Sequence, residues 1–316
     1  MINLFYLSPN TTGGWVTFTA HLMMSLQEQG HAVALYKVGN NTERTQRPFG
    51  YGVFYRNVTA DDAVKLAKDG PSAVVAVQKN FADVAAALLR AGAKAVLHDP
   101  TELSAGFAVE APRAPWVIRR AVQRQVQGSV FIRHPYVRRP APARPPKKRG
   151  VVSTSRIDFD KHTEILLDAN RLGAGIEIRG FENRLYTKFK ILPKYPEWVQ
   201  SVAAYPRDAD AAYELLSRAK FMVDMSLIKG DGGGTQYTFL EAWDAGAVPI
   251  INTGWVLKGD DMVPDKNCLT AYDGKSLLRA VKTRDVAHLV EAGYKALKRH
   301  APKTIVPQVL EWINAR

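Results

Sequence analysis

The amino-acid sequence predicts an α/β protein built from two Rossmann-like domains that face each other across a cleft. In both halves of the chain, short apolar runs alternate with segments of helical periodicity, which is typical of a parallel sheet flanked by helices. A proline-rich, basic segment at residues 138–150 separates the halves and predicts an extended linker. In the second half, a glycine-rich loop at residues 230–234 leads directly into a helical pattern.

The first half begins with a predicted βαβ unit. An apolar run at residues 2–7 is followed by helical periodicity that ends at Gly30, and a second apolar run follows at residues 32–36. Further strands are predicted at residues 73–77 and 95–97. Because helices separate these strands, we expect a parallel sheet.

The second half repeats this alternation. Its predicted strands are residues 151–153, 176–178, 221–223 and 248–251. Its predicted helices are residues 163–172, 209–219, 238–245 and 275–281, and a last helix is expected at residues 307–315. We assign residues 1–145 to an N-terminal domain and residues 146–302 to a C-terminal domain, and we expect the helix within residues 303–316 to cross back to the N-terminal domain.

Composition is that of a globular protein, for which we expect a cytoplasmic location. The chain has 316 residues, of which 46% are hydrophobic, and no apolar run reaches the roughly 18 residues of a transmembrane helix. The first residues, MINLFYLSPN, show neither the basic region nor the cleavage site of a signal peptide. Cys268 is the single cysteine, so we expect no internal disulfide and no cysteine-cluster metal site.

The positive charge is concentrated between residues 113 and 149. The net charge of the chain is +13, and every charged side chain in this segment, with histidine taken as neutral, is Lys or Arg. A polyanion is the natural partner for such a segment, either nucleic acid or an anionic membrane surface. A solvated linker is the alternative interpretation of Lys147, Lys148 and Arg149.

Gly230, Gly232, Gly233 and Gly234 form a loop ahead of a helix that carries Glu241. The backbone N–H groups at a helix N-terminus lack partners within the helix, and the helix dipole favours an anion there. The loop therefore predicts a nucleotide or sugar-nucleotide site. A plain glycine turn is the alternative interpretation.

Four motifs resemble those of the retaining GT-B glycosyltransferases of the glycosyl-transferase group-1 family, which includes glycogen and sucrose-phosphate synthases. They are NTTGGW at residues 10–15, LHD at 97–99, SRIDFDK at 155–161 and FLEAWDAGAVPI at 239–250. Each motif is weak alone, and their common order over most of the chain carries the resemblance. The resemblance implies the GT-B fold, a nucleotide-sugar donor that by family habit is a UDP-sugar, and no metal cofactor.

The resemblance assigns roles to individual residues on the donor side. Arg156 and Lys161 would face the donor diphosphate and stabilise the charge that develops on the leaving group. Glu241 would accept hydrogen bonds from the ribose hydroxyls, and His98 would lie beside the donor sugar as a third catalytic candidate. The other donor-binding candidates belong to the two glycine motifs: Gly13, Gly14, Gly234, Thr235, Gln236 and Tyr237.

The chain departs from the family pattern at Gly233, where the family carries a glutamate eight positions before Glu241. This departure alters the contacts to the donor sugar, and Asp231 is the candidate to replace the missing carboxylate; Gly233 itself remains a donor-binding candidate. We interpret the Asp-x-Asp strings at residues 158–160 and 208–210 as surface turns, and we predict no metal site. Retaining enzymes of this fold are thought to use front-face attack, so no protein nucleophile is expected.

The basic segment bears on the acceptor, which GT-B enzymes bind with the N-terminal domain. We favour a hydroxylated pyrimidine in DNA, of the kind that bacteriophage glycosyltransferases modify, with the base turned out of the stack. The aromatic side chains Trp116, Phe131 and Tyr136 could stack on that base. The residues expected to contact DNA are Arg119, Arg120, Arg124, Arg133, Arg138, Arg139, Lys147 and Lys148.

Other acceptors and one other function class stay open. A lipid or envelope polysaccharide is the second acceptor hypothesis, because a basic face also suits an anionic membrane; a small molecule or a protein is the third. A non-catalytic nucleic-acid-binding module on a GT-B scaffold is the alternative of another class. Ile118, Val122 and Val126 are spaced as one apolar helix face, which favours packing against the sheet.

Overall fold

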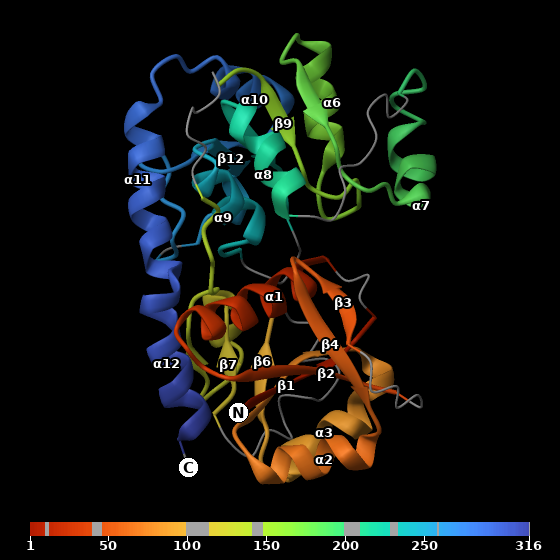
Figure 1. The fold of residues 1–316 in the computed structure, drawn as a ribbon. Helices are drawn as coiled ribbons and strands as arrows, with labels where there is room; N and C mark the ends of the chain where they lie inside the picture. The colour runs from red at the N-terminus through yellow and green to blue at the C-terminus, as the bar shows by residue number, and fades with distance from the viewer. Residues whose placement is uncertain are drawn as a thin grey trace. The chain divides into compact units, whose positions relative to one another are not determined.

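The computed structural model describes residues 1–9, 13–39, 46–98, 114–140, 148–198, 209–227, 233–257 and 259–315. The chain forms two compact units (Figure 1). Unit 1 comprises Met1–Val137 and Arg299–Arg316, and unit 2 comprises Arg138–Lys298. The sequence places these divisions at residues 145 and 302; in the structure they fall after Val137 and after Lys298.

Unit 1 contains an eight-stranded sheet in the order β3-β4-β2-β1-β5-β6-β7-β8. Its strands are β1 (Ile2–Leu7), β2 (Val33–Val38), β3 (Arg47–Gly50), β4 (Val53–Val58), β5 (Ser72–Val77), β6 (Lys94–Leu97), β7 (Trp116–Val117) and β8 (Val130–Phe131). Strand β1 pairs in parallel with β2 on one side and with β5 on the other. All residues of β1 and β5 are buried, as in parallel strands covered on both faces.

The expectation of a parallel sheet is wrong at one edge, where β3 and β4 pair antiparallel. The two residues that join them, Tyr51 and Gly52, have φ angles of +56° and +77°. Positive φ at both central residues is what a tight two-residue hairpin requires. A connection this short joins antiparallel neighbours, because a parallel crossover needs about a dozen residues or more.

The helices of unit 1 are α1 (Gly13–Glu28), α2 (Ala60–Asp69), α3 (Ala82–Arg90), α5 (Arg120–Gln123) and α12 (Pro302–Asn314), with the 3-10 turn η1 (Lys79–Phe81). The predicted helix through Ile118 and Val126 is wrong in extent, because α5 covers a single turn. Its packing is as the apolar spacing indicates: Val122 is fully buried in the core against the sheet, and Val126 packs beside it.

Trp312 in helix α12 makes the contacts that hold this helix against the rest of unit 1. The buried Lys94 ammonium donates to the carbonyl of Trp312, in the last turn of the helix, where a cation offsets the helix dipole. The Trp312 indole donates to the carbonyl of Ala114 (2.9 Å) and its ring lies 5.5 Å from that of Trp116. The helix begins at Pro302, ahead of the predicted residue 307, because proline fits the first turn of a helix.

Unit 2 contains a five-stranded parallel sheet in the order β10-β9-β11-β12-β13. Its strands are β9 (Val151–Ser153), β10 (Ile176–Ile178), β11 (Phe221–Asp224), β12 (Val248–Asn252) and β13 (Leu269–Ala271). Its helices are α6 (Thr163–Arg171), α7 (Arg184–Tyr186), which continues as the π-helical turn η2 (Thr187–Ile191), α8 (Ala209–Arg218), α9 (Tyr237–Asp244), α10 (Gly274–Val281) and α11 (Ala287–Leu297). Strand β13, the α7 turn and α11 are additions to the predicted pattern.

The strand order creates a topological switch point in unit 2. Strand β10 lies on one side of β9 and β11 lies on the other, so the chain leaves β9 in one direction and later returns on its opposite side. In open α/β sheets the crevice outside the carboxyl ends of such strands is the usual ligand site. The side chains of the loops that follow β9 and β11 are therefore the first candidates for contacts with a ligand.

Candidate functional site

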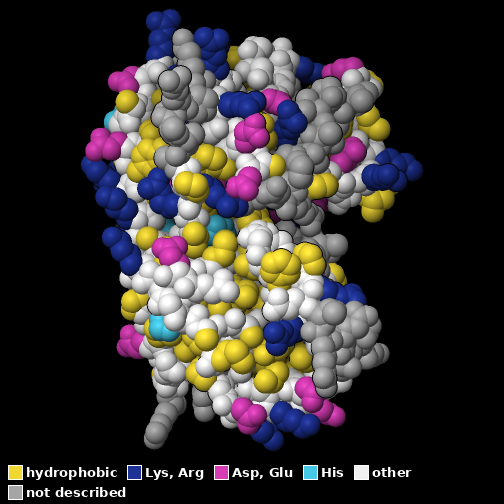
Figure 2. All heavy atoms as spheres, viewed as in Figure 1, with side chains coloured by type: hydrophobic (Ala, Val, Ile, Leu, Met, Phe, Trp, Pro, Cys, Tyr) yellow, Lys and Arg dark blue, Asp and Glu magenta, His cyan; other side chains and the backbone are white. Residues whose placement is uncertain are grey.

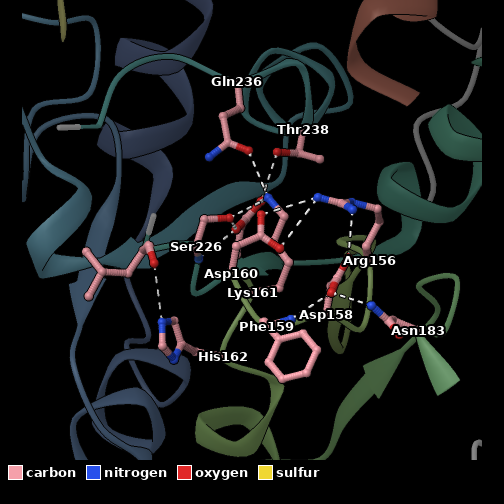
Figure 3. Close-up of polar contacts among 12 residues, drawn as sticks. Arg156, Asp158, Phe159, Asp160, Lys161, His162, Asn183, Ser226, Gln236 and Thr238 are labelled. Carbon is pink, nitrogen blue, oxygen red and sulfur yellow. Dashed lines mark hydrogen bonds and ion pairs between the residues drawn. The ribbon is translucent and has the colours of Figure 1, made fainter. Parts of the chain in front are cut away.

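The candidate site lies at the carboxyl ends of β9 and β11. The loop after β9 carries Arg156 and Lys161, and the residues after β11 include Ser226. Gln236 and Thr238 come from the start of α9, which reaches the same place (Figure 3). Three segments far apart in sequence thus converge on one polar cluster.

Lys161 is the centre of this cluster, with a side chain that is 11% exposed. Its ammonium group donates to Ser226 Oγ (2.6 Å) and to Gln236 Oε1 (3.2 Å), and lies 3.9 Å from Asp224 Oδ2 (Figure 3). A four-carbon side chain is normally mobile. Here its acceptors come from the loop after β11 and from the entrance of α9, so the cation is held at the switch point.

Asp224 is the last residue of β11 and is almost completely buried. It accepts from the backbone N–H of Ser226 (2.9 Å) and from Thr238 Oγ1 (3.2 Å). Burial by itself raises the pKa of the Asp224 carboxyl, but the Lys161 ammonium and the Ser226 hydrogen bonds outweigh burial and hold the pKa below its usual range. Asp224 is therefore a buried anion beside Lys161, and nothing in the sequence marked it as a site residue.

Arg156 is the second cation at the switch point, and its side chain is 55% exposed. It donates to Asp158 Oδ2 (2.7 Å) and to Asp160 Oδ2 (3.3 Å). Asn183 in turn donates to Asp158 Oδ1 (2.8 Å), which fixes that carboxylate. The interpretation of Asp158 and Asp160 as plain surface turns is incomplete, because both carboxylates orient Arg156.

Backbone contacts join the loop after β9 to the residues after β11. The N–H of Leu227 donates to the carbonyl of Asp160 (2.9 Å), and the His162 ring contacts the carbonyl of Leu227 (3.4 Å; Figure 3). His162 has a φ of +47°, in the left-handed region that a side chain with a Cβ rarely occupies. Because non-glycine residues persist there only when neighbours hold them, the loop that presents Lys161 is rigidly supported.

Gly233 lies against the backbone of Trp255. A Cβ at this position would be 2.0 Å from the Trp255 carbonyl oxygen, and the φ of Gly233 is +88°. The Trp255 indole also donates to the carbonyl of Gly234 (2.7 Å), which fixes the approach of the two segments. Glycine is thus a steric requirement at residue 233, and a glutamate there is incompatible with this backbone.

The N-terminus of α9 follows directly from this turn. Thr235 is buried, and its hydroxyl bonds to Asp260 Oδ1 (3.0 Å) and Asp261 Oδ2 (3.2 Å). Gln236 is the N-cap residue, Tyr237 is the first helical residue, and the first turn carries no acidic side chain. The carboxylates near this helix start belong to other segments, and the positive end of the helix dipole favours an anion here.

Glu241 lies one turn further along α9. Burial raises the pKa of its carboxyl to about 8; next in importance, Arg139 lowers the pKa and Asp244 raises it. The hydrogen bonds found among the described residues do not reach this carboxylate. Glu241 therefore has acceptor capacity to offer a hydroxyl-bearing ligand.

The pKa of Glu241 predicts a specific pH dependence of stability. The unfolded carboxyl ionises near 4.5 and the folded one near 8, so the unfolded state holds fewer protons between these values and stability falls as pH rises through this window. Above pH 8 the ionised Glu241 lowers the free energy of unfolding by at most about 5 kcal/mol. We expect Glu241→Gln to raise the thermal midpoint at pH 9 and to leave it unchanged at pH 4.

Glu291→Gln, which removes an exposed carboxylate paired with Lys295, is the control and should change the thermal midpoint little at either pH. Equal effects at pH 4 and pH 9 would contradict the prediction.

Two of the basic residues singled out in the sequence donate hydrogen bonds to backbone carbonyls within their own units. Arg119 is 9% exposed, and its Nε donates to the carbonyl of His98 (2.9 Å). Lys148 donates to the carbonyls of Leu216 and Ala245, near the ends of α8 and α9, and desolvation lowers its pKa to about 8. These cations are committed to carbonyl groups and present little charge to a polyanion.

Arg138 and Arg139 are likewise engaged within unit 2. Arg138 Nε donates to Asp244 Oδ1 (2.8 Å), and the backbone N–H of Arg139 donates to Asp244 Oδ2 (2.8 Å). The Arg139 guanidinium pairs with Asp210 (3.3 Å). Asp244 is buried, so these contacts fix the start of the unit, while the Arg138 side chain stays 49% exposed.

Among the described basic residues of unit 1, Arg120, Arg124 and Arg133 are accessible. Arg124 is exposed, and Arg120 and Arg133 are partly exposed. The Arg120 guanidinium lies 4.1 Å from the centre of the Phe131 ring, and that of Arg133 lies 5.5 Å from it. These arginines and Phe131 combine cationic and aromatic surface in one place.

His98 follows β6 in unit 1 and is buried. Its Nε2 contacts the carbonyl of Val75, and its ring packs edge-on against Phe18 at 4.5 Å. Gly13 and Gly14 form the first turn of α1, where an added Cβ would meet nothing within 4 Å. Asp231, Lys147, Gly230 and Gly232, which the sequence also singles out, lie outside the described residues.

Neither a metal centre nor a membrane span is visible in the parts of the chain that the structure describes. Those residues contain no cluster of three or more His, Cys, Asp or Glu side chains placed to hold a metal ion. No helix among them has the length and apolar character needed to span a bilayer.

The sequence matches no protein-family model and no curated protein sequence. Its structure is similar to that of an alpha-glucosyltransferase in complex with UDP and a 13-mer DNA containing an HMU base, with a TM-score of 0.70, 14% identity and 100% of both chains covered. It is also similar to Anabaena HepE in complex with UDP and glucose (TM-score 0.66, 13% identity, 99% of both chains). A third similar structure is the lipopolysaccharide outer core galactosyltransferase WaaB (TM-score 0.65, 12% identity, 99% of this chain and 98% of that one). The chain therefore has the GT-B fold.

Proposed function

We propose that this protein is a glycosyltransferase that moves a sugar from a UDP-sugar to a hydroxyl group. The observation that carries the proposal is the pair of oriented cations at the switch point of unit 2, Arg156 and Lys161, of which Lys161 contacts Gln236 at the N-cap of α9. The fold supports the same class, because the similar structures include glycosyltransferases bound to UDP.

The chemistry requires stabilisation of a leaving diphosphate. When the bond at the anomeric carbon breaks, negative charge grows on the diphosphate, and preorganised donors aimed at that charge lower the barrier. Arg156 offers a planar fork of donors and Lys161 a compact ammonium group. The backbone of Gly233, Gly234 and Gln236 leads the chain into α9, whose positive end adds to the same field.

Other residues complete the proposed donor site. Glu241 accepts hydrogen bonds from the ribose hydroxyls, which fits a carboxylate without a hydrogen-bond donor among the described residues. His98, Gly13 and Gly14 stay proposed donor-side residues on the strength of the sequence resemblance alone. Asp231 supplies the carboxylate that residue 233 cannot carry. In this scheme the anomeric configuration is retained without a protein nucleophile.

We place a hydroxylated pyrimidine base of DNA first among the acceptors. The exposed or partly exposed Arg120, Arg124 and Arg133 can neutralise backbone phosphates, and Phe131 beside them offers an aromatic face. One similar structure was solved with DNA containing an HMU base, which makes this acceptor chemistry the first to test.

A lipid or envelope glycan is the second candidate acceptor, and a surface of α7 and the π-helical turn η2 favours it. Leu185, Phe189 and Leu192 follow helical spacing on the exposed side, at 62%, 61% and 40% exposure. The exposed cations Lys188 and Lys190 lie among them in sequence, and Figure 2 shows hydrophobic and basic side chains next to one another around α7. An apolar stripe flanked by cations suits an anionic lipid surface.

Mass spectrometry of the acceptor tests the proposal directly. The purified protein is incubated with individual UDP-sugars and duplex DNA that carries 5-hydroxymethylpyrimidines, and in parallel with lipid and glycan acceptors. We expect a mass gain of one glycosyl group on the modified DNA and none on unmodified DNA. Transfer to the lipid or glycan alone would establish the second acceptor. DNA binding without any turnover of a UDP-sugar would instead establish a non-catalytic binding module.

The salt dependence of DNA binding tests the three accessible arginines. Each phosphate contact contributes about 0.9 to the slope of log K against log salt concentration. We therefore expect Arg120, Arg124 and Arg133→Ala together to lower this slope by about 2 to 3. The control replaces Lys68, Lys79 and Arg90, which are exposed elsewhere on unit 1, with alanine and should keep the wild-type slope. An unchanged slope in the arginine variant would remove these residues from the DNA contact.

A further inference from the structure

The geometry points to Asp224 as the residue that positions Lys161: a buried carboxylate that holds the lysine ammonium at the carboxyl ends of β9 and β11, through the Ser226 hydroxyl, before any anion binds. This inference rests on the proposed function, because it takes Lys161 to face the donor diphosphate. Asp224 is assigned no contact with the donor; it acts through Lys161.

The direction of the hydrogen bonds defines the connection between the two residues. An ammonium group only donates, and a carboxylate only accepts. The Ser226 hydroxyl therefore accepts from Lys161 (2.6 Å) and donates to Asp224 Oδ1. The other carboxylate oxygen, Oδ2, lies 3.9 Å from the ammonium nitrogen. Lys161 and Asp224 are thus linked both through a hydroxyl and by direct charge attraction.

The same carboxylate also fixes the start of α9. Thr238, in the first turn of that helix, donates to Asp224 Oδ2 (3.2 Å), and the Ser226 N–H donates to Oδ1 (2.9 Å). Gln236, at the helix N-cap, accepts from Lys161. Asp224 therefore holds the lysine and the helix N-terminus in one fixed arrangement, which is the pair of elements that would meet a diphosphate.

Burial makes this arrangement costly unless both charges are present. Asp224 is 1% exposed, and an ionised carboxylate in such a place needs an opposite charge and hydrogen bonds. Asp168, by contrast, pairs with Lys194 at 3.0 Å where both side chains are well exposed, and a pair of that kind contributes little. The chain keeps a buried anion beside Lys161 because the lysine needs a fixed position, not because the pair is a favourable way to fill a core.

Loss of the Asp224 carboxylate should affect UDP binding and catalytic turnover differently. The negative charge of Asp224 weakens the attraction between Lys161 and a diphosphate. Removing the carboxylate should therefore leave the affinity for UDP equal or higher. Removing it also frees the lysine side chain, so the cation is no longer aimed at the charge that develops during transfer. A residue that only stabilised the fold would lower affinity and turnover together.

The test uses Asp224→Asn in the 316-residue protein, with Asp168→Asn as the matched control. We expect Asp224→Asn to lower kcat for UDP-sugar consumption by about 10- to 100-fold, with the dissociation constant for UDP unchanged or lower. In a Lys161→Met background the Asp224→Asn change should lower kcat far less than in the wild type, because only its contact with Thr238 at the start of α9 is then lost. Ser226→Ala, which removes the connecting hydroxyl and keeps both charges, should reproduce the kcat loss. Asp168→Asn should match the wild type.

Two results would overturn the inference: a wild-type kcat in Asp224→Asn, or an equal kcat loss with and without Lys161. A stability cycle separates its failure from failure of the proposed function. Lys161→Met leaves Asp224 buried and unpaired, so it should lower the thermal midpoint, and adding Asp224→Asn should restore much of that loss. If the wild type consumes no UDP-sugar, the proposed function fails, while this cycle still decides whether Asp224 and Lys161 are coupled; additive midpoints would show that they are not.

Discussion

Gly233→Ala is expected to destabilise unit 2 by more than about 4 kcal/mol and to abolish UDP binding. The added Cβ would lie 2.0 Å from the carbonyl oxygen of Trp255, and a φ of +88° strains any side chain. The neighbouring segment cannot move away freely, because the Trp255 indole holds the carbonyl of Gly234 at 2.7 Å. Chemical denaturation and UDP titration measure the two effects.

Gly259→Ala is the matched control for this variant. Gly259 has a similar φ of +84°, but a Cβ there would meet nothing within 4 Å. It should cost about 1 to 2 kcal/mol, which is the price of the backbone conformation alone. If both variants lose the same stability, the close approach of Gly233 to Trp255 is not what makes glycine necessary.

Arg156→Ala is expected to lower kcat for sugar transfer by about 100- to 1,000-fold. The guanidinium is held by Asp158 and Asp160 in the loop after β9 and is 55% exposed, so its donors can turn to a diphosphate. Without it, the two carboxylates would remain beside an anionic ligand and repel it. The kinetics of UDP-sugar turnover, with kcat and KM determined separately, measure the loss.

Arg171→Ala is the control for Arg156. Arg171, the last residue of α6, is an arginine of similar exposure in the same unit and pairs with Glu197 at 2.6 Å. Its removal should leave kcat unchanged, because a surface pair of this kind contributes little. Arg156→Lys should retain only part of the activity, since an ammonium group cannot form the two-pronged contact of a guanidinium. Full activity in Arg156→Ala would exclude this residue from the chemistry.

Local pattern was enough to predict much of unit 2. The strands at 151–153 and 176–178 were predicted at their observed bounds, because apolar runs of buried parallel strands are distinct from their flanks. The edge hairpin β3–β4 was missed although Gly50 and Gly52 marked its turn. The short α7 and the π-helical turn after it carry too weak a periodic pattern to be predicted.

The sequence did not predict which residues of the basic segment are buried and which are exposed. Charge along the chain did not distinguish Arg119, which serves a buried carbonyl, from Arg124, which is exposed. Lys148 reads as part of a solvated linker, yet it donates to carbonyls at two helix ends. Partners of this kind come from distant segments, so only the folded chain reveals which cations remain available.

The sequence by itself determined the glycine loop before α9, the cations Arg156 and Lys161, and the α/β alternation that brings them to one edge of a sheet. These are local features, set by residue type and spacing. The tertiary structure alone decided that Asp224, 63 residues beyond Lys161 in sequence, lies beside its ammonium group, and that residue 233 must be glycine. Both depend on contacts between segments far apart in the chain: a charge pair that forms when β11 packs next to β9, and a steric limit set by the backbone of Trp255.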